Sequence, residues 1–144
     1  MTAPIRPSEK EQSTMATEGF ENGLRIRKEV VGAEYVERAF ENAGEFGKDF
    51  QEIVTEFCWG ASWGRDALSR RDRSLLNLAI IGTLGRTAEF RLHTRGALRN
   101  GVSIDELRDT LIHLAVYAGI PAGVEAFRIA KEVIDEVHAE QAAN

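Results

Sequence analysis

The sequence has 144 residues, the size of one domain with a core of its own. Its formal charge is -5, with lysine and arginine scattered among the acidic residues, so we expect no basic face for nucleic acid. No apolar run approaches the roughly 20 residues that span a membrane, and the polar start lacks the apolar core of a signal peptide. We predict a cytoplasmic protein without membrane or nucleic-acid partners. The single cysteine, Cys58, excludes an intrachain disulfide framework and a multi-cysteine zinc site.

The first half of the chain predicts a polar arm followed by helices. Residues 1–17 are polar and predict a disordered arm, while residues 18–140 predict one helical domain. A helical pattern runs from about Phe20 to Ala43, with an interruption near Gly32. The apolar residues between Phe46 and Phe57 then recur at spacings of three and four, which is the period of a helix and not of a strand.

The central helix is the most apolar part of the sequence. Ser69 and Asp72 form an S-x-x-D pair, which is typical of a helix start. The apolar residues between Leu75 and Leu84 cover nearly every face of the helix that follows. Such a pattern predicts a helix that is buried on all sides.

Three further signals divide the second half into helices. Asn100-Gly101 predicts a left-handed helix end, and Ser103 to Glu106 is a capping box that starts the next helix. Gly119 and Pro121 predict a break before a last helix that runs to about Ala139. No strand candidate is visible, so we predict an all-α, single-domain helical bundle.

Glu89 and His93 stand four residues apart within the predicted fourth helical segment. Their β-carbons would lie about 6 Å apart on one face, so the carboxylate could orient the imidazole. A positioned imidazole contributes about 10²–10⁴-fold to proton-transfer reactions. A surface Glu–His pair that adds a few tenths of a kcal/mol to helix stability has the same spacing. The local pattern alone does not decide between an acid–base pair and a surface pair.

Four arginines lie within the same segment, namely Arg86, Arg91, Arg95 and Arg99, a composition typical of a solvated helix face. Arg86 lies three residues before Glu89 and seven before His93, so we expect all three side chains on one face. A guanidinium beside an acid–base pair would suit a carboxylate substrate, which it can bind through two hydrogen bonds.

The segment from Trp59 to Val102, with the pattern WGxxWxRxxLxRxxRSLLxLAxxxxLGRxxEFxxHxRxALxNGV, resembles the γ-carboxymuconolactone decarboxylase family. The similarity continues through LRDTLIHLAVYAGIPAGVEAFRIAKEV and covers roughly residues 23–133. The resemblance implies a helical protomer in a homo-oligomer, a hexamer or trimer, that acts on a small anionic lactone. The implied reaction converts 4-carboxymuconolactone to 3-oxoadipate enol-lactone and CO2 in aromatic breakdown, without a cofactor or metal.

This reaction suggests roles for polar residues in the matched segment. The unsaturated lactone can accept the electrons that CO2 leaves behind, so the protein must hold a dianion, stabilise an oxyanion and return a proton to carbon. We expect His93 to donate the proton and Glu89 to orient it. Arg86 and Arg73 are the candidates for binding the substrate carboxylates.

Three aromatic residues are candidates for the walls of the substrate pocket. Trp59, Trp63 and Tyr117 would keep water away from the departing carboxylate. Ordinary core packing explains the same residues equally well for the two tryptophans, and better for Tyr117.

Two features leave other functions open. Alkylhydroperoxidase D-like relatives carry C-x-x-C-x-x-x-H, and here Arg86 and Glu89 occupy the cysteine positions before His93, so dithiol chemistry is absent from that motif. We expect Cys58 to be buried and inert, with a one-cysteine hydroperoxide-handling protein as an alternative. Glu125 would repel a dianion if it faced the pocket. A paralogue acting on another small lactone or oxo-acid and a non-catalytic binding protein are the remaining alternatives.

Overall fold

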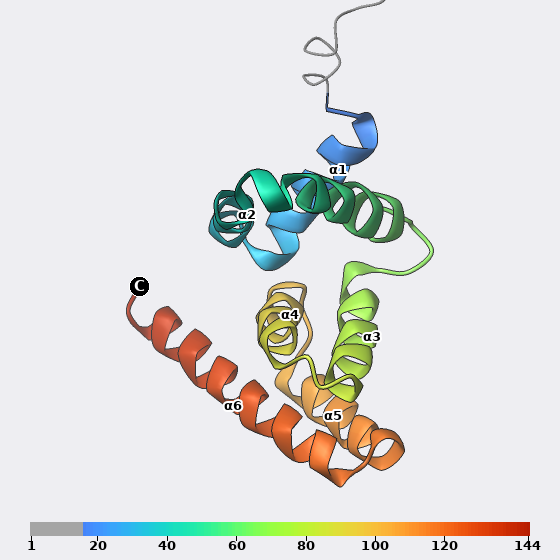
Figure 1. Ribbon diagram of the computed structural model, residues 1–144. Coiled ribbons are helices and arrows are strands. Elements are labelled where there is room, and N and C mark those ends of the chain that lie inside the picture. The colour runs from blue at the N-terminus through green and yellow to red at the C-terminus, as the bar shows by residue number, and fades with distance from the viewer. Residues whose placement is uncertain (1–15) are drawn as a thin grey trace, which may run out of the picture.

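The computed structural model describes residues 16–144, so the predicted arm lies almost entirely outside the described residues. The described chain is helical without strands, which confirms the all-α prediction. No helix in residues 16–144 is both long and apolar enough to cross a membrane. The helices, shown in Figure 1, are α1 (Glu18–Val31), α2 (Ala33–Ile53), the π-helix η1 (Val54–Ser62), α3 (Arg70–Thr83), α4 (Thr87–Arg99), α5 (Ile104–Ala118) and α6 (Ile120–Ala142).

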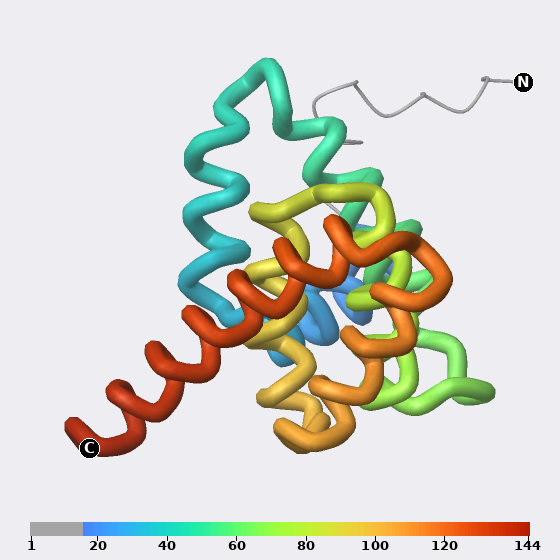
Figure 2. The backbone as a smooth tube through the Cα atoms, turned by 90° about the horizontal axis from the view of Figure 1, so that it is seen from below, coloured from blue at the N-terminus to red at the C-terminus, as the bar shows by residue number. Residues whose placement is uncertain are grey.

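The helices form two layers, each with its own apolar core (Figure 1). In the first layer, α1, α2 and η1 enclose a set of side chains that we call the aromatic cluster: Ile26, Val30, Val31, Val36, Trp59 and Trp63. In the second layer, α3 to α6 enclose the C-terminal cluster: Leu78, Phe90, Ala97, Val102, Leu107, Leu111, Ala126, Ile129, Ala130 and Val133. Figure 2 shows α6 crossing the second layer and extending past it at the C-terminus.

Helix α1 and η1 pack with their backbones in close contact, because glycines stand where they meet. A β-carbon at Gly23 would overlap the carbonyl of Thr55, and one at Gly60 would overlap the carbonyl of Gly19. The π-helical turns continue directly from α2 and carry Trp59. π-Helical turns are rare and occur often at functional sites, because they change the direction of side chains relative to the preceding helix.

Helix α2 changes direction at Gly44, whose φ of 54° lies in the left-handed region that glycine adopts without strain. The helix continues after this kink as the sequence pattern predicted. The apolar residues that follow the kink, however, do not enter a core of the protomer. Phe46 and Phe50 in α2 are exposed, as are Ile53 at its end and Phe57 in η1.

The predicted helix boundaries are confirmed by their capping geometry. The Ser69 hydroxyl accepts a hydrogen bond from the Asp72 amide at the start of α3. Ser103 and Glu106 form both hydrogen bonds of a capping box at α5. Gly101 and Gly119 have φ values of 89° and 109°, so both supply the left-handed turns that follow helices α4 and α5.

Helix α3 is not buried on all sides within one protomer, so the predicted complete burial does not hold for a protomer alone. Leu78 is fully buried, but Leu76, Ile80 and Leu84 are 49%, 55% and 66% exposed. The helix packs against α4 and α5 and only lightly against α6. One protomer therefore covers only part of its apolar circumference.

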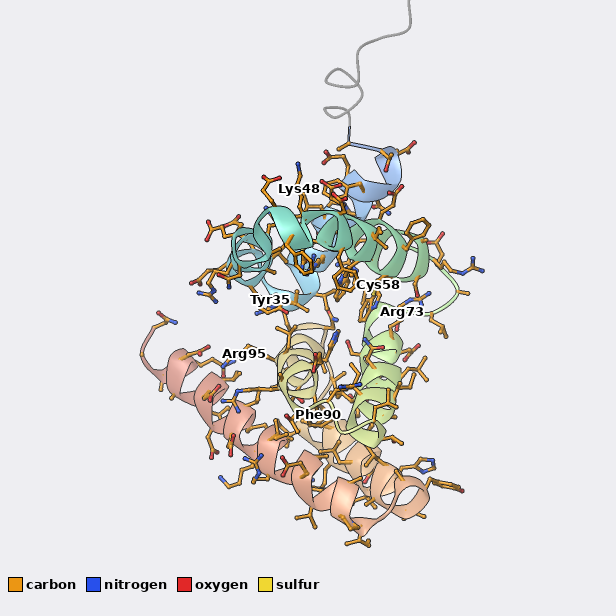
Figure 3. The ribbon with its side chains drawn as sticks, viewed as in Figure 1. Tyr35, Lys48, Cys58, Arg73, Phe90 and Arg95 are labelled. Atoms are coloured by element: carbon orange, nitrogen blue, oxygen red, sulfur yellow. The ribbon has the colours of Figure 1, made fainter. Side chains whose placement is uncertain are left out.

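The arginines of α4 contact neighbouring helices on two sides. They therefore do not form the purely solvated face that the composition suggested. Arg99 donates to the carbonyl of Val30 at the end of α1, with Nη1 2.6 Å from the oxygen. Arg95 and Arg91 point toward α6, as Figure 3 shows for Arg95, and pair with its carboxylates. The carboxylates on α6 are Glu132, Glu136 and Glu140. These contacts fix α4 relative to both layers.

Candidate active site

His93 lies where the aromatic cluster meets α4. Its ring is nearly parallel to that of Trp59, with an interplanar angle of 7° and centroids 5.9 Å apart. Trp63 lies at 6.3 Å from the same ring, and the two tryptophans are 5.0 Å from each other. Both tryptophans are buried, and His93 is half-buried. The structure thus brings together three of the residues that the sequence analysis selected.

The edge of the His93 ring contacts an asparagine that the sequence analysis did not select. The amide Nδ2 of Asn77, on α3, lies 3.4 Å from His93 Nδ1. Asn77 is the one polar side chain in the apolar run from Leu75 to Ile81, and this is the signal that could have identified it. Glu89 is exposed, and no hydrogen bond joins it to His93 within residues 16–144.

The surroundings of His93 favour the neutral imidazole. Burial lowers the pKa of His93 to about 4, from an ordinary value of 6.5, because a charged ring loses its hydration there. The negative charge of Glu89 acts in the opposite direction and raises this pKa, but it is the smaller effect. At neutral pH the ring is therefore uncharged, with one nitrogen as a hydrogen-bond donor and the other as an acceptor.

Arg73 lies near the start of α3, on the end of the helix that adjoins η1 (Figure 3). It precedes Asn77 by one helical turn, so the two side chains leave the same face of α3. Its Nη2 donates to the carbonyl of Arg65 at 3.1 Å. Its Nε is buried without a hydrogen-bond partner in the described part of the chain, so the guanidinium has donor capacity to spare.

Arg86 and Glu125 both line a different site, a small pocket between α3, α4 and α6. Phe90, a member of the C-terminal cluster, forms part of its wall. Arg86 precedes the first helical residue of α4 and has non-helical backbone angles, so helical spacing does not place it beside His93. The carboxylate of Glu125 accepts two hydrogen bonds from Arg128, which lower its pKa.

Sequence comparisons identify the family of this chain. The model of the carboxymuconolactone decarboxylase family matches residues 48–132. Over 118 residues the chain is 41% identical to 4-carboxymuconolactone decarboxylase of Acinetobacter baylyi, covering 82% of this chain and 88% of the relative. The chain belongs to the carboxymuconolactone decarboxylase family. It is also 44% identical over 120 residues to nitrosuccinic acid decarboxylase NpaB of Metarhizium robertsii, covering 82% of each.

Tyr117 does not adjoin His93 in this member of the family. Its side chain lies on α5, 80% exposed, with its ring 4.6 Å from that of His113. Within residues 16–144 its ring forms an aromatic pair with His113 and none with Trp59 or Trp63. The role of Tyr117 as a pocket wall stays a prediction.

Cys58 is exposed, so the prediction of a buried thiol was wrong. It lies on η1 next to Trp59, which is buried, and successive residues of a helix point in different directions (Figure 3). Partial burial of the sulfur still raises the pKa of the thiol, and the nearby charge of Arg27 only partly opposes this shift. The thiol is therefore protonated at neutral pH, the less nucleophilic form.

Proposed function

We propose that this protein is a cofactor-free decarboxylase of a small dianionic acid, with 4-carboxymuconolactone as the first candidate substrate. The observation that carries the proposal is the position of His93 beside Asn77 and two buried tryptophans. The relatives from Acinetobacter baylyi and Metarhizium robertsii are both named as decarboxylases, which supports this class of reaction.

The substrates named for the two relatives share one chemical feature: a carboxylate attached to a carbon that can pass electrons to an oxygen. In 4-carboxymuconolactone the electrons released by the departing CO2 move into the unsaturated lactone. In nitrosuccinic acid they move onto the nitro group. In both cases a C–C bond breaks, CO2 leaves, an oxyanion forms, and the carbon finally takes one proton from solvent. The substrate supplies the electron sink, and the protein supplies binding and charge stabilisation.

We assign the stabilisation of this oxyanion to His93. Its ring is neutral, and Asn77 occupies Nδ1, so Nε2 is the nitrogen that can carry a proton toward the substrate. A neutral imidazole can donate a hydrogen bond to a developing oxyanion without a prior change of charge. Delivery of a full proton, the role expected from the sequence, would first require the bound dianion to raise the pKa of His93.

Arg73 is the candidate for binding the second carboxylate of the substrate. Its unpartnered Nε and its position one turn from Asn77 support this role. Trp59 and Trp63 would shield the reacting end from water. We retain Glu89 as an electrostatic neighbour of His93, and Arg86 as a carboxylate-binding candidate at the separate pocket.

The test is to incubate the purified protein with 4-carboxymuconolactone and, in parallel, with nitrosuccinic acid, and to measure CO2 release. Turnover of the lactone alone supports the first candidate, and turnover of the nitro acid alone assigns the same chemistry to the other substrate. The proposal is wrong if neither substrate is decarboxylated and Arg73→Ala binds both as tightly as the wild-type protein does. The alternatives are then a different substrate, such as another lactone or an oxo-acid, or a binding protein without catalytic activity.

We further propose that the protein is a homo-oligomer, as expected from the resemblance. Three helices that pack together carry apolar side chains that are about half exposed or more. Burying these side chains between protomers would stabilise an assembly. They are Leu76 and Ile80 on α3 with Leu84 at its C-cap, Ile112, Val116 and Tyr117 on α5, and Ile120 and Val124 on α6. Light scattering at micromolar concentration should give a trimer or hexamer. A monomeric mass would contradict the proposed homo-oligomer.

The cytoplasmic location expected from the sequence stays a prediction.

A further inference from the structure

Asn77 is a polar residue in the most apolar helix of the protein. It lies on α3, between residues whose side chains form or adjoin the C-terminal cluster, and it is half-buried. An amide in such a place loses hydrogen bonds to water unless a partner replaces them. The partner is His93 on α4, with 3.4 Å between Asn77 Nδ2 and His93 Nδ1. This distance is long for a hydrogen bond, as is common at active sites before the substrate binds.

The direction of this hydrogen bond determines where the imidazole carries its proton. The Nδ2 group of an asparagine can only donate, so the nitrogen that faces it must be the acceptor. This geometry calls for an unprotonated His93 Nδ1, which places the ring proton on Nε2. The near-parallel ring of Trp59 covers one face of the imidazole and limits its rotation.

The charged groups around His93 do not provide a second way to orient the ring. Glu89, on the same helix, acts on His93 through its charge and not through a hydrogen bond in the described residues. Arg73, from α3, directs its Nη2 to the backbone of Arg65. From η1 and the residue that follows it, the two side chains against the ring are the uncharged Trp59 and Trp63.

We propose that Asn77 is a positioning residue that holds His93 as the neutral tautomer with its proton on Nε2. This inference rests on the proposed decarboxylase function, in which the Nε2–H group donates to the oxyanion formed as CO2 leaves. A donor fixed in advance avoids the cost of reorienting during the reaction. Desolvation, which lowers the pKa of His93, maintains the same neutral state.

The inference is tested by nitrogen-15 NMR of the His93 ring together with steady-state kinetics. In the wild-type protein at pH 7 we expect a protonated Nε2 and a bare Nδ1, with the signal assigned by its loss in His93→Gln. In Asn77→Asp the carboxylate should accept a hydrogen bond from a protonated Nδ1, which reverses the tautomer, and kcat should fall by about 10-fold or more. In Asn77→Ala, which leaves Nδ1 without a partner, we expect a mixture of tautomers and a smaller loss.

Asn42→Asp is the matched control, since it makes the same change on an exposed part of α2 and should alter neither the tautomer nor kcat. A wild-type ring protonated on Nδ1 would overturn the inference. So would an Nε2–H ring that persists with unchanged kcat in both Asn77 variants. The NMR measurement needs no substrate. Absence of turnover would therefore overturn the proposed function, while the NMR result would still decide whether Asn77 determines the tautomer of His93.

Discussion

The two apolar clusters of the protein differ in what they contain and in what they border. The C-terminal cluster consists of aliphatic side chains and Phe90, enclosed by four helices. The aromatic cluster is smaller, adjoins the buried polar residues Arg27 and Thr55, and has the imidazole of His93 against its tryptophans. The comparison indicates that the C-terminal cluster provides stability, whereas the aromatic cluster provides a desolvated wall for chemistry.

Truncation within the C-terminal cluster should give the largest effect and should act on stability. Leu111 is 1% exposed, so Leu111→Ala should cost about 2–5 kcal/mol in the free energy of unfolding through lost contacts and a cavity. Urea denaturation measures this change. Leu68→Ala, the same substitution at a residue 42% exposed, should cost far less. Equal losses for the two variants would contradict the assignment of stability to this cluster.

Removing the imidazole beside the aromatic cluster should act mainly on catalysis. His93→Ala should lower kcat/KM by about 10²-fold or more, since no neighbouring group in the described structure can replace the Nε2–H donor. Initial rates of CO2 release measure this effect. His138→Ala, an exposed histidine on α6, should leave the rate unchanged. Near-normal turnover by His93→Ala would show that the catalytic group lies elsewhere than beside the aromatic cluster.

Acid should destabilise the protein through the same histidine. The folded-state pKa of about 4 is lower than the ordinary value of 6.5, so the unfolded chain binds more protons between these values. The contribution is complete above pH 6.5 and is lost as pH falls toward 4, amounting to about 2–3 kcal/mol. Urea unfolding at pH 7 and pH 4.5 should show this loss in wild-type protein and not in His93→Gln. An identical loss in both would show that His93 is not desolvated.

Glu89→Gln should have a smaller effect, because Glu89 acts on His93 only through its charge. Removing the charge should lower the pKa of His93 further, so the acidic limb of kcat/KM should move to lower pH. The loss of kcat at pH 7 should stay below about 10-fold. A shift of the acidic limb to higher pH would contradict the electrostatic role.

The smallest effect is expected at Cys58, which adjoins the aromatic cluster in sequence but is exposed. Cys58→Ser should change kcat by no more than a few-fold, and should alter the free energy of unfolding by about 0.5 kcal/mol or less. The raised pKa of the thiol supports this expectation. Complete loss of activity in a folded Cys58→Ser protein would favour thiol chemistry instead, and thiol labelling against pH would then measure its reactivity.

The sequence predicted the helices well because their boundary signals are local. The Ser69 cap, the Ser103–Glu106 capping box and the glycine turns each depend on residues within one turn of the helix end. It also placed Trp59 and His93 on one site, although only through the resemblance of the whole segment. It did not select Asn77, because the importance of a single amide depends on which helix faces it.

The sequence by itself determined the helical class, the helix boundaries and the family, since these follow from local capping, periodicity and residue identity. The tertiary structure decided which side chains are covered and which groups meet. It left one side of α3 exposed, placed Arg86 at another pocket, and gave His93 an asparagine as its hydrogen-bond partner. The physical reason is that burial and the pKa of His93 depend on long-range packing between η1, α3 and α4, which spacing along one helix does not specify.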